Sequence, residues 1–151
     1  MHPIQDNFQT DDLDRRILTA LASDSRRSYA DVASEVGMST AAVHERVRKM
    51  VERGVIERFS IRVVPEALGL HLTAFVAIRN DGGAHCRDIA ERLRELPEVV
   101  EVHSVAGEHD SLVKVRCANA RALEDVLYAI KAIAGVLRTT STVVLNTEFE
   151  R

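Results

Sequence analysis

Apolar residues in the first third of the chain recur every three or four positions, which is the period of an amphipathic helix. The first such segment begins among acids, which the positive end of a helix dipole favours, and its apolar face consists of Leu13, Ile17, Leu18 and Leu21. A second, short helix is expected to open at Ser28, which with Asp31 has the pattern of a capping box, and to stop at Gly37.

A third helix is expected from Ser39, a favourable capping residue, to about Arg53. Its buried face consists of Val43, Val47 and Met50. Three short helices with a glycine corner at Gly37 predict a helix-turn-helix, and the strand pattern from Val55 to Val64 supplies the strand of a winged form. Pro65 ends this strand.

The remainder of the chain alternates strands and helices in another order. The pattern predicts a strand at His71–Arg79, a helix at Cys86–Leu96, strands at Val99–Ala106 and Leu112–Cys117, a helix at Ala120–Ala134 and a strand at Leu137–Phe149. This β-α-β-β-α-β order is typical of a ferredoxin-like plait, a fold that hosts many functions. The expected fold class is therefore α+β, with a winged helix-turn-helix at residues 1–64, a linker at 65–70 and a plait at 71–151.

Composition narrows the class of protein without identifying it. The 151 residues are 46% hydrophobic and 28% charged, with a net charge of −3, which is typical of a folded soluble domain and not of a globally basic nucleic-acid binder. The amino terminus lacks a signal-peptide pattern, and no apolar run is long enough to span a membrane. Cys86 and Cys117 are expected to be reduced thiols, so we expect a cytoplasmic protein without a membrane partner.

The third predicted helix has the surface of a recognition helix. Small residues at its start admit close approach to base edges, and basic residues follow on its outer side. Residues 44–62 contain six basic and three acidic residues, so the net negative charge of the whole chain hides a local positive patch. The alternative is a helical bundle with an ordinary solvated face. The candidate DNA-binding residues are Ser39, Thr40, Ala41, His44, Glu45, Arg46, Arg48 and Lys49.

A short polar segment, Gly107-Glu108-His109-Asp110, separates two predicted strands of the plait. It fits a plain hairpin turn, with positive φ at Gly107 and capping of backbone amides by Asp110. It also fits a metal site that includes His103, although no CxxC or HxxxH spacing supports one and we assign no metal. A third possibility is a free amino acid, whose ammonium needs a carboxylate and whose carboxylate needs amides or hydroxyls.

The same residues resemble the Lrp/AsnC family of bacterial and archaeal transcription regulators. The resemblance extends from Asp11 to Glu148. It is carried by the opening Leu13–Leu18, by "GMSTAAVHERVRKMVERGVIERF" at Gly37–Phe59, by the linker Pro65–Gly69, by the plait and by the Gly107-x-x-Asp110 hairpin. It implies an amino-terminal DNA-binding domain and an ACT-like, RAM-type domain that senses amino acids. It also implies dimers that assemble further, often to octamers, around effector sites between plaits.

The chain departs from the family pattern within the hairpin. Glu108 and His109 stand where the family commonly has an aspartate and an aromatic residue, and Ser111 follows in place of a bulky residue. A changed pocket wall changes which ligand fits. The residues that we expect to bind the effector are Val105, Gly107, Glu108, His109, Asp110, Thr139 and Ser141.

The predicted function is that of a sequence-specific DNA-binding transcription regulator that responds to a small effector, expected to be an amino acid. The predicted partners are double-stranded DNA, the effector and further copies of the chain. We expect neither a cofactor nor catalysis, because no nucleophile and base are paired and no glycine-rich phosphate loop is present. The alternative is a stand-alone plait that binds an amino acid or a metal. We expect loss of Asp110 to abolish the effector response with little effect on the fold.

Overall fold

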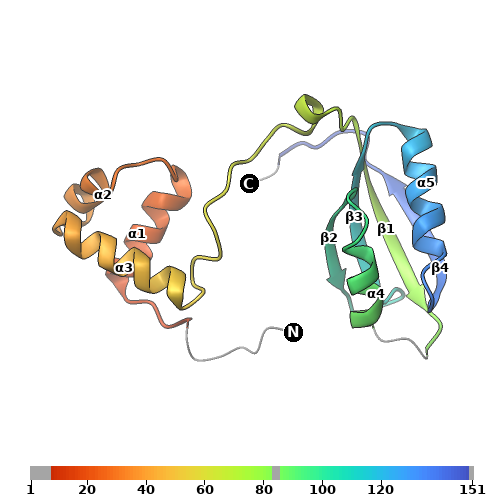
Figure 1. Cartoon of the computed structure of the whole chain (residues 1–151), viewed down its shortest axis with the longest axis horizontal. Coiled ribbons are helices and arrows are strands. Elements are labelled where there is room, and N and C mark those ends of the chain that lie inside the picture. The colour runs from red at the N-terminus through yellow and green to blue at the C-terminus, as the bar shows by residue number, and fades with distance from the viewer. Residues whose placement is uncertain (1–7, 83–85, 150–151) are drawn as a thin grey trace. The chain divides into compact units, whose positions relative to one another are not determined.

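The computed structural model describes residues 8–82 and 86–149. The chain divides into two compact units, residues 1–62 and residues 63–151 (Figure 1). The first unit is helical, and the second contains the sheet. No helix in the described part of the chain has the length and apolar character needed to cross a membrane.

Three helices form the first unit: α1 (Asp12–Ser23), α2 (Tyr29–Val36) and α3 (Thr40–Glu52). One apolar core joins them, and its fully buried members are Ile17, Val32, Val43 and Met50. The corner between α2 and α3 is made by Gly37, whose φ of 75° lies in the left-handed region. This arrangement confirms the predicted helix-turn-helix.

The capping box lies on another helix than the one predicted. At α2, the Ser28 hydroxyl accepts the Asp31 amide at 3.1 Å and itself donates to the Asp31 carboxylate at 2.6 Å. At α1, Asp11 and Asp14 form the reciprocal pair, because the side chain of each accepts the backbone N–H of the other, at 2.7 and 3.3 Å. The acids at the start of α1 therefore have specific partners besides the helix dipole.

The predicted strand from Val55 to Val64 is wrong, because the described residues 55–64 form no strand. Gly54 ends α3 with a φ of 74°, and Val55 and Ile56 then both donate to the Met50 carbonyl, at 2.8 and 3.1 Å. Beyond this turn the backbone pairs with no strand among residues 8–82 and 86–149, so its strand propensity is not realised. Ile61 is 84% exposed.

The second unit begins with a short 3-10 helix, η2 (Pro65–Leu68), in the predicted linker. Its other elements are β1 (Leu72–Asn80), α4 (Cys86–Leu93), β2 (Val99–Ser104), β3 (Ser111–Cys117), α5 (Ala120–Lys131) and β4 (Val136–Val143). The sheet is antiparallel with strand order β2-β3-β1-β4, which confirms the predicted plait. The predicted ends of α4, α5 and β4 at Leu96, Ala134 and Phe149 are too late, because turns or unpaired chain follow the last ladder and helix bonds.

The two faces of the sheet differ. Alternate residues of β1, among them Val76 and Ile78, are fully buried in a core shared with α4 and α5. The residues between them, such as Phe75 and Ala77, lie on the opposite face beside Lys114 and Leu112 of β3. We call this opposite surface the open face, because α4 and α5 both pack on the other side of the sheet (Figure 1).

Candidate functional site

The start of α3 presents small, exposed residues, as the sequence predicts for a recognition helix. Ser39 caps the helix, since its hydroxyl oxygen accepts the backbone N–H of Ala42 at 3.2 Å. Thr40 and Ala41 follow in the first turn, and both are exposed. The caps and the glycine corner thus hold a short polar surface where a base edge could approach.

The outer side of α3 carries a network of ion pairs. Arg48 donates through Nε and Nη2 to both carboxylate oxygens of Glu45, at 2.9 and 2.7 Å, and its Nη1 contacts Glu52. Lys49 lies 3.5 Å from Glu45. The hydrogen bond from Arg48, followed by its positive charge and that of Lys49, lowers the pKa of Glu45 to about 2.

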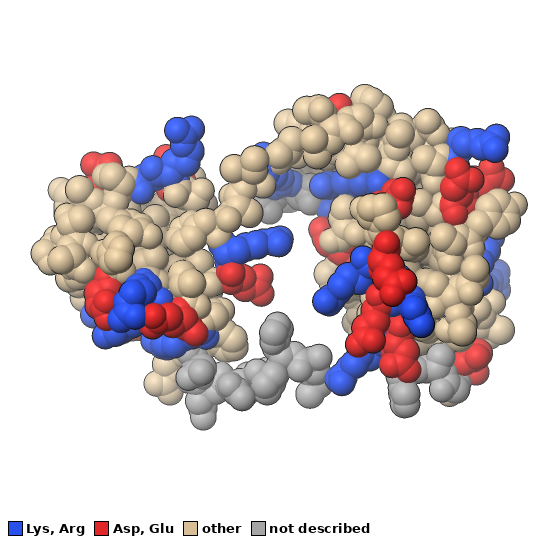
Figure 2. Space-filling model, viewed as in Figure 1, with Lys and Arg blue, Asp and Glu red and all other residues tan. Residues whose placement is uncertain are grey.

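This network changes the predicted positive patch. On the outer side of α3, two bases lie between two acids, so their charges nearly cancel at close range. Figure 2 shows acidic and basic side chains intermixed on both units. Approaching DNA would have to compete with the carboxylates of Glu45 and Glu52 for the guanidinium of Arg48.

Two flanking residues of α3 point toward neighbouring helices. The ring of His44 packs edge-on against Tyr29 of α2, with centroids 5.6 Å apart. Arg46 forms ion pairs of 2.7 Å with both Asp11 and Asp14 at the start of α1. The structure therefore gives Arg46 partners within the protein, whereas the sequence placed it among the candidate DNA contacts.

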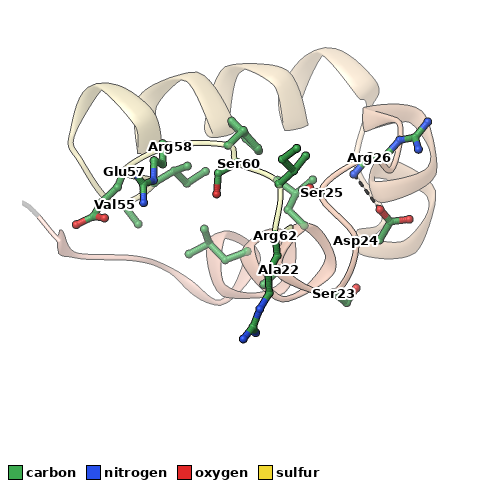
Figure 3. A pocket seen from close by; sticks show the side chains of 15 residues that line it. Ala22, Ser23, Asp24, Ser25, Arg26, Val55, Glu57, Arg58, Ser60 and Arg62 are labelled. Carbon is green, nitrogen blue, oxygen red and sulfur yellow. Dashed lines mark hydrogen bonds between the residues drawn. The ribbon is translucent and has the colours of Figure 1, made fainter. Parts of the chain in front are cut away.

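A cavity of about 740 Å³ lies between the end of α1 and the chain that follows α3. Figure 3 shows residues 55–62 passing over the last turn of α1. Apolar side chains such as Leu21 and Phe59 share its lining with Arg26 and Arg58. Sequence analysis did not predict this cavity, because the cavity depends on the path of residues 55–62, for which a strand was expected.

In the plait, the hairpin between β2 and β3 is anchored through Asp110. The carboxylate of Asp110 accepts the backbone N–H of Asn80 at 2.8 Å. The backbone N–H of Asp110 donates to the Ile78 carbonyl at 2.9 Å, and the backbone carbonyl of Asp110 accepts the N–H of Val105 at 3.1 Å. Gly107 has a φ of 145°. Gly107 and Glu108 are exposed and His109 is half-buried, so the hairpin presents its middle residues to a ligand while Asp110 holds its base.

The predicted hydroxyl residues of β4 are not beside this hairpin within one chain. Thr139 pairs with Ile78 and Ser141 with Val76, so both belong to the side of the sheet that faces the helices. Strand β1 lies between β3 and β4. Two strand spacings, about 10 Å, therefore separate Thr139 from the base of the hairpin.

Asn80 and Cys86 are neighbours of the hairpin that sequence reasoning missed. The Asn80 side-chain amide donates to the Cys86 sulfur at 3.2 Å, and that thiol lies 4.0 Å from the Asp110 carbonyl. The buried side-chain oxygen of Asn80 has no hydrogen-bond partner among the described residues. Only the sheet register brings residues 80 and 110 together, so no local pattern could have indicated this contact.

The metal-binding possibility finds no cluster in the described chain. Among residues 8–82 and 86–149, no three His, Cys, Asp or Glu side chains are placed to share an ion. His103 instead lies 3.3 Å from Glu101 on the same strand, and Glu101 also pairs with Lys114 at 3.2 Å. Burial is the largest single effect on the pKa of Glu101 and raises it. Hydrogen bonds and electrostatic interactions with His103 and Lys114 together outweigh burial, so the pKa lies below its usual value.

Comparison with known proteins places both units in one family. The Lrp/AsnC ligand binding domain matches residues 73–151, and the AsnC-type helix-turn-helix domain matches residues 11–51. The chain belongs to the Lrp/AsnC family. The HTH-type transcriptional regulator LrpA of Mycobacterium tuberculosis, a family relative, is 44% identical over 141 residues, which are 93% of each chain.

Solved structures of Lrp/AsnC proteins have the same fold. A feast or famine regulatory protein of M. tuberculosis, complexed with L-methionine, superposes with a TM-score of 0.87 at 44% identity, over 93% of this chain and 95% of that one. AsnC of E. coli superposes with a TM-score of 0.83 at 33% identity, over 95% and 97%. The present protein is thus a helix-turn-helix transcription regulator with an amino-terminal DNA-binding domain and a carboxy-terminal ligand-binding domain.

Proposed function

We propose that this regulator responds to a free amino acid, which binds at the hairpin of residues 105–110 and alters the assembly or the DNA binding of the protein. The observation that carries the proposal is the Asp110-anchored hairpin, whose exposed middle lies in the domain that matches the family's ligand-binding domain. A relative of 44% identity is complexed with L-methionine, which supports an amino acid as the ligand class. The expected role is regulatory and not enzymatic, and it is exerted on DNA in the cytoplasm.

The chemistry of the hairpin suits the two charged groups of an amino acid. A ligand ammonium would be attracted by Glu108 and by the second carboxylate oxygen of Asp110. A ligand carboxylate would meet exposed backbone around Gly107, with Val105 and His109 beside it. Thr139 and Ser141 would join this site only from the last strand of a neighbouring copy, because β1 separates them from the hairpin of their own chain.

We further propose that the protein is at least a dimer and assembles to a larger homo-oligomer, as the family resemblance implies. Two surfaces support self-association. The open face carries half-buried Phe75, Ala77 and Leu112, and α4 and α5 both pack on the other side of the sheet. Residues 59–63 alternate exposed apolar and polar side chains, and they have unused strand propensity. A dimer would also present two copies of α3 to two half-sites.

The proposed DNA-reading surface is the exposed start and outer side of α3. It consists of Ser39, Thr40, Ala41, His44, Glu45, Arg48 and Lys49. Of these, Arg48 has the geometry for a guanine edge. Its guanidinium carries five N–H groups, and Glu45 and Glu52 accept three of them, which leaves two that can donate to a base.

Calorimetry with a panel of the twenty amino acids tests the effector proposal. The informative variant is Asp110→Asn, because its amide oxygen can still accept the Asn80 N–H while the negative charge is lost. We expect at least one amino acid to bind the wild type, and the variant to bind it tens- to hundreds-fold more weakly, as expected for loss of a charge-assisted bond of about 1.5–3 kcal/mol.

The matched control is Asp125→Asn, which removes the same charge from the exposed side of α5 and should leave affinity unchanged. Equal affinity in the wild type and Asp110→Asn would make the hairpin a structural turn only. Absence of binding by all twenty amino acids would contradict the proposed effector class.

A further inference from the structure

The start of α1 and the middle of α3 are joined by a closed set of hydrogen bonds. Asp11 accepts the Asp14 N–H with one carboxylate oxygen and contacts Arg46 with the other, at 2.7 Å in both cases. Asp14 accepts the Asp11 N–H at 3.3 Å and the Arg46 guanidinium at 2.7 Å, again with different oxygens. All four carboxylate oxygens therefore have a partner. We call these three residues the α1–α3 clasp.

The clasp is more sheltered than the ion pairs on the outer side of α3. Asp14 is only 7% exposed, and the side chain of Arg46 is 29% exposed, compared with 49% for Arg48. Hydrogen bonds from the Asp14 amide and from Arg46 lower the pKa of Asp11, and hydrogen bonds to Asp14 and Asp11 raise the pKa of Arg46. Taking Arg46 away would leave a buried carboxylate without its cation, which is costly.

The positions of Arg46 and Arg48 on the helix separate their roles. Two residues along an α-helix correspond to a rotation of about 200°, so side chains at i and i+2 point to different sides. Arg46 points to α1, where its Nη1 is shared by two acids. Arg48 points outward, where its partners are exposed and lie on its own helix.

We propose that Arg46 is a positioning residue: it fixes the orientation of α3 against the capped end of α1 and does not itself contact DNA. This inference rests on the proposed reading of DNA by α3. A recognition helix must hold its side chains within a fraction of an ångström of the base edges. Besides the apolar core, the two ion pairs of Arg46 fix α3 against the start of α1. We therefore expect loss of the clasp to impair sequence discrimination before it impairs folding.

The alternative, a phosphate contact by Arg46, makes an opposite forecast for Asp11→Asn. Asparagine caps a helix as well as aspartate does, so this variant keeps the cap of α1 and removes one of the two negative charges that hold Arg46. If Arg46 were a phosphate ligand, this weaker hold would strengthen DNA binding. If Arg46 is a positioning residue, loosening it weakens binding to the preferred sequence.

The experiment titrates full-length wild type, Arg46→Ala, Asp11→Asn and the double variant with two duplexes over a series of salt concentrations. One duplex is the preferred fragment of the gene's own upstream region, and the other has random sequence. Circular dichroism sets a temperature at which every variant is folded. Asp12→Asn is the matched control, because Asp12 is the neighbouring acid, with a 94% exposed side chain that pairs only with Arg15 among the described residues.

We expect Arg46→Ala and Asp11→Asn each to weaken binding to the preferred fragment about tenfold, and the double variant to be no weaker than Arg46→Ala, because residues of one network do not act additively. Binding to random duplex should change less than about twofold, and the dependence on salt should be unchanged, since no phosphate contact is lost. Asp12→Asn should behave as the wild type.

Three results would overturn the inference. A salt slope reduced by about 0.9 in Arg46→Ala, with tighter binding by Asp11→Asn, would make Arg46 a phosphate ligand. Wild-type discrimination in both single variants would limit the clasp to folding stability. A wild type that distinguishes no fragment from random duplex would contradict DNA reading by α3 itself, and would be recognised as such before any variant is compared.

Discussion

Arg46 and Arg48 stand two positions apart on α3 and meet different partners. Arg46 is held by acids of another helix, whereas Arg48 is held by acids of its own. Exposed pairs such as Arg48 with Glu45 are worth little in water and exchange readily. Arg48 is therefore the arginine that can change partner when DNA arrives, and its carboxylate neighbours set the cost of that change.

Arg48→Ala should weaken DNA binding for two reasons. The variant loses the donor itself, and it leaves Glu45 and Glu52 facing the phosphates without their cation. If Arg48 meets a guanine edge, we expect a loss of about 1–3 kcal/mol that depends on the base. A phosphate contact would weaken all sequences alike. Titration of specific and random duplexes separates the two, with Arg92→Ala, an exposed arginine of the plait, as the control. Unchanged affinity for both duplexes would remove Arg48 from the interface.

The depressed pKa of Glu45 predicts how its ion pair responds to acid. Arg48 lowers the pKa from 4.5 to about 2 in the folded protein, so the pair contributes to stability above pH 4.5 and loses this contribution as the pH falls toward about 2. Glu45→Gln should therefore melt at a lower temperature than the wild type at neutral pH, by a small margin because the pair is exposed.

Thermal melts followed by circular dichroism should show this margin closing as the pH is lowered from 4.5 to about 2. The pKa of Asp11 also lies below its usual value, but Asp11 is present in both proteins, so its contribution cancels in the comparison. A margin independent of pH would mean that Glu45 and Arg48 do not pair in solution.

At the scale of elements, helices were predicted more reliably than strands, because a strand also needs a partner strand. Helices were predictable because each carries its own hydrogen bonds, caps and glycine stops, as with Ser28, Ser39 and Gly37. The strand expected from Val55 to Val64 has residues of high strand propensity, but no partner strand lies beside it in the part of the chain that the structure describes. The four strands of the plait were predictable because the chain supplies all of their partners.

The α2–α3 corner offers a direct test of this local control. Gly37 has a φ of 75°, and a Cβ at this position would meet no atom within 4 Å, so Gly37→Ala introduces backbone strain without a clash. We expect a loss of about 1–2 kcal/mol, the cost of left-handed backbone for an L-residue. In a helical unit of this size, that lowers the melting temperature by at least about 4 °C.

Gly37→Asn is the control for the corner, since asparagine tolerates left-handed backbone better than alanine does, and it should recover much of the loss. Equal melting temperatures for Gly37→Ala and the wild type would show that the corner has another conformation in solution.

At the scale of the whole molecule, the order of elements and the family were readable from sequence, whereas the contacts at the sites were not. The hairpin between β2 and β3 and the helix α3 lie where the sequence predicts a turn and a helix. The contact between Asp110 and Asn80 depends on strand register, and the clasp depends on helix packing. Asp110 makes three hydrogen bonds at the base of the hairpin, but only the one from its carboxylate depends on the side chain. The small effect of its loss on the fold therefore stays a prediction.

The open face of the sheet belongs to this largest scale, because its role depends on another copy of the chain. In a dimer with twofold symmetry, each residue near the axis meets its own counterpart or a close neighbour of it. Leu112 lies there beside Ala77, pointing away from the core under α4 and α5. Leu112→Glu would bring like charges together at an apolar interface, at a cost of several kcal/mol.

We therefore expect Leu112→Glu to lower the mass measured by light scattering, at micromolar concentration, from that of a dimer or larger assembly toward that of one chain. Affinity for an operator with two half-sites should fall with it, because the two copies of α3 are no longer linked. The plait should stay folded, since the substituted side chain leaves the helix-side core untouched. Leu137→Glu, at a 65% exposed position of the edge strand β4, is the matched control. A wild type that has the mass of a single chain and still binds its operator with full affinity would contradict the proposed dimer. A Leu112→Glu variant that keeps the wild-type mass would place the interface on another surface, such as residues 55–64.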